Sequence, residues 1–319
     1  MRNRGLLHIA LALAVFAAFS CKKDEEKTET KPSLYGVDFQ LPTFARPGDS
    51  FLLKPSGVST GDGKALPEKI EYKWKVNTDE YSDPMDTYTL NLPEVGNYTV
   101  YCQAYDPSET YYSTVTDKLV IVIDPAVGKT LTGTGIDIDD EHITDPRDKK
   151  DENLYFYIRK GDLEWFRNNL AWTGAGVAYE DSDVTSYPLG RYYTWEEAMD
   201  ACPDGWRLPT EEEWDALGTD AGALTANAYL NGRQMWEYWP DVTRTNESEM
   251  ALIPAGYVLV GAESPAFKRI YSYAAFWTAT ESETDPSKAR YRYIYVEDDD
   301  VKATWGDKAS LALSVRCVR

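Results

Sequence analysis

Histidine is nearly absent from this chain of 319 residues, which contains only His8 and His142. His8 lies in an apolar leader, so His142 would have to supply any imidazole chemistry alone. A histidine-based zinc site needs several ligands, and a Ser-His-Asp triad needs a histidine beside its nucleophile. The sequence therefore argues against both kinds of site. His142 itself lies in an acidic, loop-like stretch, and we assign it no functional role.

Positive charge and long apolar runs are also scarce. The chain has 33 Lys and Arg against 53 Asp and Glu, for a formal net charge of −20. A surface this acidic repels phosphate backbones, so we expect no nucleic-acid partner. After the leader, no stretch is long and apolar enough to cross a membrane as a helix.

The first 20 residues have the pattern of a secretory signal. Arg2 and Arg4 precede an apolar run, Leu6 to Phe19, which is too short to span a bilayer. The residues before Cys21 resemble a bacterial lipobox, although Ala18 stands where leucine is usual. The resemblance implies that residues 1–20 are removed and that Cys21 is lipidated, which anchors the chain to a membrane.

Residues 21–33 form a polar segment that cannot pack a core, and we expect a flexible tether. Its start, Lys22 to Glu26, is similar to the export signal of Bacteroides-group lipoproteins. That similarity implies attachment to the outer membrane, with the protein facing the cell exterior.

Residues 34–125 are predicted to form an all-β domain. Residues 70–76 and 98–105 alternate in period two, and turn residues separate such runs. Trp74 and Tyr98 stand where an immunoglobulin-type sandwich places a core tryptophan and a tyrosine near a strand start. The segment resembles PKD-like and other bacterial immunoglobulin-like domains. Cys102 is expected to be a buried free thiol on a strand.

A joint from Asp124 to Gly133 leads into a second domain, residues 133–319, of mixed pattern. Thr194 with Glu197, and Thr210 with Glu213, form two Thr-x-x-Glu capping boxes, which predict two short helices. Strands are expected before and after these helices, over residues 151–158, 250–260, 275–280, 290–296 and 312–318.

Several segments of this second domain resemble the Fibrobacter succinogenes major paralogous domain family. They include DLEWFRNNL (162–170), CPDGWRLPTEEEWDAL (202–217), FWTATE (276–281) and SVRCVR (314–319). The block at 207–214 also looks like formylglycine-generating enzymes, which share a fold with C-type lectins. The resemblance implies an α+β C-type-lectin-like domain. It also implies a disulfide between Cys202 and Cys317, because the equivalent lectin cysteines pair.

Three functional classes remain to be weighed. A formylglycine-type oxidase needs two redox-active cysteines, and the implied disulfide uses the two candidates. A carboxylate-pair hydrolase of glycans stays as an alternative, but no spacing among the acidic residues singles out a pair. Glu211 to Glu213 stand at a helix start, where acidic residues suit the helix dipole. We therefore assign no catalytic residue.

A binding module is the third class, and its candidate site is the irregular region from Gly218 to Glu249. Exposed aromatic rings can stack on sugars or peptide side chains, and carboxylates can accept hydrogen bonds from hydroxyls. The candidate ligand-binding residues are Trp236, Glu237, Tyr238, Trp239 and Asp241. The alternative is that these aromatics only hold the loop onto the core. The tryptophans of the family motifs are expected in the core: Trp165, Trp195, Trp206, Trp214 and Trp277.

No cofactor is indicated. The tripeptide signatures of calcium-dependent lectins are absent, and the acidic clusters at 137–141 and 297–300 lack the spacing of a calcium loop. The sequence thus predicts a cell-surface lipoprotein that binds a glycan, a peptide or an outer-membrane protein partner, as an accessory to a nutrient importer. The alternatives are a glycan hydrolase and a purely structural component of a surface assembly.

Overall fold

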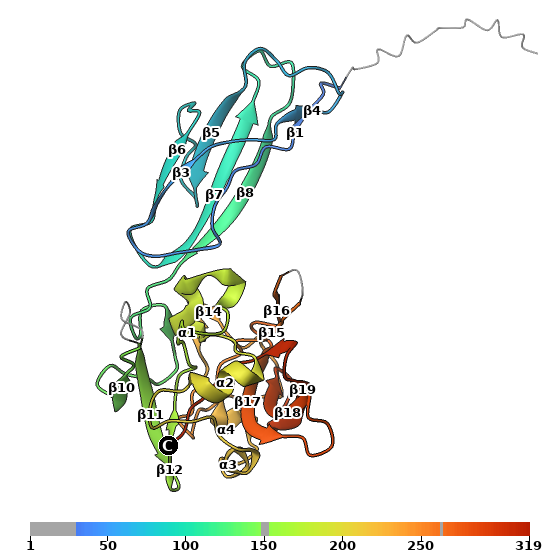
Figure 1. The fold of residues 1–319 in the computed structure, drawn as a ribbon. Coiled ribbons are helices and arrows are strands. Elements are labelled where there is room, and N and C mark those ends of the chain that lie inside the picture. Colours follow the sequence, from blue (N-terminus) through green and yellow to red (C-terminus); the bar gives the residue numbers. More distant parts are fainter. Residues whose placement is uncertain (1–29, 148–152, 262–263) are drawn as a thin grey trace, which may run out of the picture.

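The computed structural model describes residues 30–147, 153–261 and 264–319. The predicted signal, Cys21 and the tether up to residue 29 lie outside the described residues. Figure 1 shows two units arranged end to end, a β-domain followed by a second domain that contains the helices. Among the described residues, no helix combines the length and the apolar character that crossing a membrane requires.

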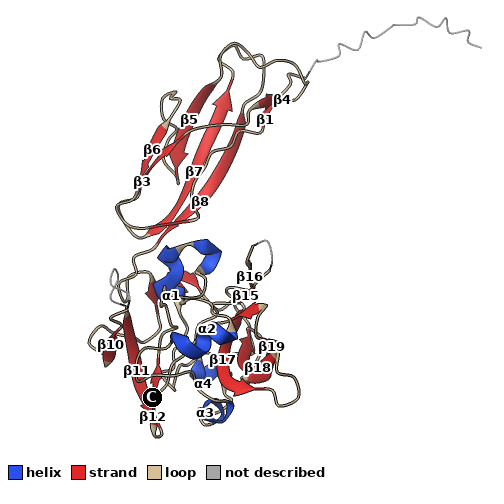
Figure 2. Ribbon diagram, viewed as in Figure 1, coloured by secondary structure: helices blue, strands red, loops and turns tan. Residues whose placement is uncertain are grey.

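The first unit is built from β-strands alone (Figure 2). A four-stranded sheet has the order β2-β8-β7-β5, β3 pairs with β6, and β1 pairs with β4. The all-β architecture predicted for this part of the chain is thus present. The strands are β1 (Leu34–Tyr35), β2 (Phe44–Ala45), β3 (Ser50–Leu53), β4 (Ser59–Thr60), β5 (Glu71–Val76), β6 (Tyr88–Asn91), β7 (Gly96–Tyr105) and β8 (Thr114–Val122).

Trp74 is at the centre of the core of this unit. Its ring stacks on Tyr88 at 5.8 Å between centroids and meets Phe39 edge-on at 5.3 Å. Cys102 is the cross-strand neighbour of Trp74 and is a buried free thiol, as predicted. Burial raises the pKa of Cys102 to about 12, because a desolvated thiolate is unfavourable. The hydroxyl of Tyr98 donates to the Glu94 carbonyl at 2.9 Å and fixes the turn before β7.

The second unit combines short helices with several small sheets. Its central sheet has the order β17-β18-β19. The helices are α1 (Ser186–Leu189), α2 (Trp195–Ala201), α3 (Glu211–Asp215) and α4 (Ala221–Leu224), with 3-10 turns η1 (Tyr179–Asp181) and η2 (Asp183–Thr185). The strands are β9 (Leu131–Thr132), β10 (His142–Thr144), β11 (Leu154–Lys160), β12 (Leu163–Phe166), β13 (Tyr229–Leu230), β14 (Arg233–Gln234), β15 (Tyr257–Leu259), β16 (Ala266–Lys268), β17 (Tyr273–Glu281), β18 (Lys288–Tyr295), β19 (Lys302–Asp307) and β20 (Leu311–Ala312).

Both predicted capping boxes are present. The Thr194 side chain accepts from the Glu197 N–H at the start of α2, and Thr210 does the same with Glu213 at α3. In each pair the glutamate also accepts from the backbone N–H of the threonine. Two otherwise unpaired donors are therefore satisfied at each helix start.

The two units are joined through the β13–β14 turn as well as through the chain itself. The Asn231 side-chain amide donates to the Val122 carbonyl at 3.0 Å and to the Gly96 carbonyl at 3.3 Å. Phe44 also packs edge-on against Tyr179 at 6.0 Å between centroids. The second unit thus contacts the ends of β2, β7 and β8.

Candidate functional site

The candidate binding region, Gly218 to Glu249, contains α4, β13, β14 and an irregular segment after β14. Within it, residues 235 and 236 are buried and residues 237–241 are exposed. We call residues 237–241 the aromatic loop tip. Of the predicted cluster, only the side chains of the loop tip are therefore accessible to a ligand.

Trp236 is a core residue, and its predicted role as a ligand-stacking residue is wrong. Its side chain is 0% exposed and belongs to a cluster with Trp165 and Met250. Its indole N–H points toward the Leu252 carbonyl at 3.4 Å. Because both ring faces are covered, no ligand can stack on it. For Trp236 the alternative that the ring holds the loop onto the core is therefore the correct one.

Arg244, which the sequence did not single out, lies over the Trp236 ring at 3.8 Å from the centroid. One end of its guanidinium donates to Thr225 Oγ1 at 3.0 Å and the other to the Val296 carbonyl at 2.8 Å. Burial lowers the pKa of Arg244 to about 10, which still leaves the side chain charged at neutral pH. Trp236 and Arg244 together form the base from which the loop tip extends.

Gly222 in α4 allows the far end of this loop to pack closely. A Cβ added at this position would lie 2.3 Å from the Thr243 carbonyl oxygen, well inside contact distance. The Gly222 carbonyl in turn accepts from the Thr245 N–H at 2.9 Å. The loop is therefore held at both ends, by the Trp236–Arg244 stack and by α4.

The loop tip presents two aromatic rings and two carboxylates to solvent. Tyr238 is 79% exposed and Trp239 is 44% exposed, whereas most aromatic side chains of this unit are buried or half-buried. Glu237 and Asp241 flank them and are exposed as well. Four of the five predicted ligand-binding residues are thus accessible together at the loop tip.

Two of the three acidic residues at the start of α3, Glu211 and Glu213, form internal contacts. Glu213 completes its capping box and pairs with Arg207. Glu211 accepts from Arg290 at 3.2 Å and from Arg292 at 2.8 Å. These contacts agree with the structural interpretation of this acidic run.

The two acidic clusters also have protein partners. Asp140 accepts from Arg167 at 2.6 Å, and Asp298 pairs with Lys302. His142 is exposed, and its Nδ1 lies 2.8 Å from the Asp140 carbonyl. In the described part of the chain, no three or more His, Cys, Asp or Glu side chains are grouped as a metal site.

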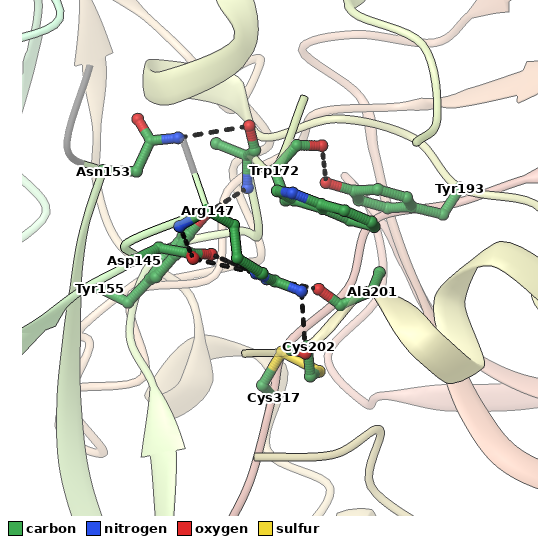
Figure 3. Close-up of polar contacts among 10 residues, drawn as sticks. Asp145, Arg147, Asn153, Tyr155, Trp172, Tyr193, Ala201, Cys202 and Cys317 are labelled. Carbon is green, nitrogen blue, oxygen red and sulfur yellow. Dashed lines mark hydrogen bonds and ion pairs between the residues drawn. A yellow bond between two sulfur atoms is a disulfide. The ribbon is translucent and has the colours of Figure 1, made fainter. Parts of the chain in front are cut away.

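A buried polar network lies beside the disulfide (Figure 3). The Arg147 guanidinium donates to both oxygens of Asp145, which is 0% exposed, and stacks on Trp172 at 4.4 Å. Its two terminal nitrogens also donate to the carbonyls of Ala201 at 2.8 Å and Cys202 at 3.1 Å. These carbonyls end α2, so the cation satisfies orphan acceptors and complements the helix dipole. The network thus holds the end of α2 against the segment that carries Asp145 and Arg147.

The disulfide implied by the sequence is present between Cys202 and Cys317, with 5.9 Å between the Cα atoms. It joins the residue that follows α2 to Cys317, which lies after the last strand, β20, across a sequence separation of 115. The bridge leaves neither cysteine available as a catalytic thiol.

The sequence model of the Fibrobacter succinogenes major domain matches residues 158–319, slightly more than half of the chain. The chain belongs to this family. The matched segment of the Fibrobacter succinogenes major domain includes the disulfide, the loop tip and the central sheet. Its motif tryptophans are buried as predicted: Trp165, Trp195, Trp206, Trp214 and Trp277. The match begins after β9 and β10, which precede it in the second unit.

No curated protein matches the chain. Among solved structures, the chain is similar to three N-terminal domains of the bacteriophage RB49 highly immunogenic outer capsid protein (Hoc). That similarity has 11% identity, covers 89% of this chain and 69% of the other, and gives a TM-score of 0.25. A second similarity, to Salmonella alpha-2-macroglobulin reacted with methylamine, has 12% identity, coverage of 91% and 22%, and a TM-score of 0.20.

Proposed function

We propose that the protein is a lipid-anchored surface protein whose Fibrobacter succinogenes major domain binds a ligand without transforming it. The observation that carries the proposal is the loop tip, where Tyr238 and Trp239 are exposed side by side between two carboxylates. Large exposed rings in a polar surround favour a ligand with apolar faces and hydroxyl or amide groups, such as a glycan or a peptide.

We also propose that this domain has a C-type-lectin-like fold. Two features support the assignment. The capped helix α2 is followed directly by Cys202, which pairs with a cysteine near the C-terminus. The ligand-presenting region would then be the irregular segment after the second helix, where the loop tip lies.

The first unit would act as an immunoglobulin-like or PKD-like spacer between the tether and the binding domain. The core tryptophan on β5 and the Tyr98 hydroxyl bond to the Glu94 carbonyl support this assignment. The contacts of Asn231 with the ends of β7 and β8 support a fixed rather than a freely jointed spacer.

The binding proposal is tested with the soluble chain that starts after Cys21, on glycan and peptide arrays with and without calcium. A ligand found there should bind the Tyr238→Ala/Trp239→Ala variant about tenfold more weakly or worse, because stacked aromatics dominate such contacts. The matched control is Trp305→Ala, since Trp305 on β19 has a nearly equal exposure of 43%. Equal loss in the control, or consumption of the ligand, would reject the proposal.

The anchor and its orientation need a separate test. Metabolic labelling with a palmitate analogue should mark the wild-type protein and not a Cys21→Ser variant. Protease added to intact cells should remove the protein if it faces the exterior. Survival of the full-length protein under conditions that digest a known surface protein would place it on the inner side.

A further inference from the structure

The last strand of the first unit, β8, has one unpaired edge. On one side β8 pairs with β7 along its whole length. On the other side β2 pairs only with Ile121 and Val122, and the chain near Ser33 pairs only with Tyr112. Between these two parallel contacts, residues 115–119 have no strand partner on this second side in the portion of the chain that the structure describes.

The backbone polar groups of this edge point to the open side. The N–H groups of Ile121 and Ile123 donate to the Thr43 and Ala45 carbonyls, each at 2.8 Å, on the β2 side. Because backbone groups alternate in direction along a strand, residues 115, 117 and 119 direct their N–H and C=O groups to the same side. Three donors and three acceptors are therefore lined up toward solvent.

The opposite edge of the same sheet shows how an edge is normally covered. On β5, the Trp74 carbonyl accepts from the Ser82 N–H at 2.8 Å and the Tyr72 carbonyl from the Met85 N–H at 2.9 Å. The segment after β5 thus caps that edge. No described segment does the same for residues 115–119, and an uncovered edge is a template for another strand.

The side chains of this edge have a defined chemical pattern. Val115 is 47% exposed and Leu119 is 46% exposed, with the exposed Asp117 between them on the same face. Asp117 forms no ion pair within the described residues, whereas Lys118 on the other face is paired with Asp38 at 2.9 Å. The exposed face of the edge therefore presents an apolar, an acidic and an apolar group in turn.

The pattern of side chains indicates which kind of strand can pair with this edge. Two copies of β8 paired antiparallel about Asp117 would place two carboxylates directly opposite each other, which is destabilising, in a chain of net charge −20. A basic side chain at the same position would be favourable. We propose that the edge at residues 115–119 binds an extended segment of a partner protein, which adds a fifth strand and carries apolar, basic and apolar side chains at alternate positions.

The test uses two synthetic peptides, acetyl-Thr-Val-Thr-Lys-Thr-Val-Thr-amide and its counterpart with Glu in place of Lys. The wild-type chain should bind the Lys peptide with a Kd of about 1 mM or tighter, and the Glu peptide about fivefold more weakly, from the cross-strand charge pair. The Asp117→Lys variant should reverse this preference. Binding should also slow hydrogen exchange at the N–H groups of residues 115, 117 and 119.

A backbone control separates strand addition from simple charge attraction. In Val115→Pro the lost N–H points away from β7, so the variant should keep its thermal unfolding temperature and lose peptide binding. Absence of binding at millimolar peptide, an unchanged preference in Asp117→Lys, or full binding by a folded Val115→Pro variant would each overturn the proposal. So would a wild-type dimer that requires this edge.

Discussion

Arg316 is fully buried and has no carboxylate partner among its hydrogen bonds. Its guanidinium donates to Asn169 Oδ1 at 2.7 Å and to the carbonyls of Phe166 at 3.0 Å, Met250 at 2.8 Å and Ala251 at 3.1 Å. Burial lowers the pKa of Arg316 to about 9, because desolvation penalises the cation. One side chain thus satisfies acceptors on two distant segments of the chain, residues 166–169 and residues 250–251.

We expect Arg316→Lys to lower the free energy of unfolding by about 3 kcal/mol, because a lysine cannot reach these acceptors and leaves buried carbonyls unpaired. Urea denaturation measures the change. The control is Arg319→Lys, whose side chain is 41% exposed and pairs with Glu164. That exposed substitution should cost less than about 1 kcal/mol. Similar losses in both variants would contradict the assigned role of Arg316.

Asp106, at the turn between β7 and β8, gives an expected pH dependence. The Ser108 hydroxyl, and then the backbone N–H groups of Ser108, Thr110 and Tyr111, hold the pKa of Asp106 below its ordinary value of 3.8. A lowered carboxyl pKa stabilises the fold above the unfolded pKa, and this stabilisation is lost as the pH falls through the folded pKa. Asp106→Asn should therefore destabilise the chain at pH 6 more than at pH 3, as read from urea midpoints. An equal loss of stability at pH 6 and pH 3 would contradict a lowered pKa of Asp106 in the folded chain.

At the scale of elements, the sequence predicted those features that depend on neighbouring residues. The capping boxes of α2 and α3 need only a Thr and a Glu three positions apart, and both form. The strands β5 and β7 follow from period-two alternation. The disulfide and the tryptophan core came from the family motifs instead. Local sequence patterns and the family resemblance therefore predicted these helices, strands, the disulfide and the buried tryptophans.

The strand predictions were less accurate where contacts between distant segments determine the backbone conformation. The predicted strand over residues 250–260 is reduced to β15, because Ala251 has a positive φ of 52° and the carbonyls of residues 250 and 251 accept from Arg316. The predicted strand over 312–318 is reduced to β20 followed by isolated bridges to several elements. At the candidate site, Trp236 is buried in a cluster with distant residues, and Arg244, which belongs to no motif, lies over its ring.

The packing of the loop against α4 gives a prediction at this scale. Gly222→Ala should displace the loop, because the new Cβ would lie 2.3 Å from the Thr243 carbonyl oxygen. We expect a loss of about 1–3 kcal/mol in the free energy of unfolding, typical of overpacking. The exposed Trp239 should also show a changed fluorescence spectrum. A variant with wild-type stability and fluorescence would show that the loop is not held by α4.

For the whole molecule, the Asn231 amide is the main polar contact between the two units. Asn231→Ala removes its bonds to the Val122 and Gly96 carbonyls. We expect the two units to tumble more independently, as measured by NMR relaxation or by a broader distribution of distances in small-angle scattering. The control is Asn227→Ala, whose amide contacts Tyr229 and Gln234 within its own unit. Unchanged tumbling in Asn231→Ala would contradict a fixed joint.

The parallel pairing of β2 with β8 has a mechanical consequence. Tension between the two ends of the first unit would enter near Leu34 and leave after Ile123. The hydrogen bonds from Ile121 to Thr43 and from Ile123 to Ala45 join segments that run in the same direction. Such a load pulls these bonds in shear, so they must fail together rather than open one after another. The first unit is therefore built to resist extension along its length.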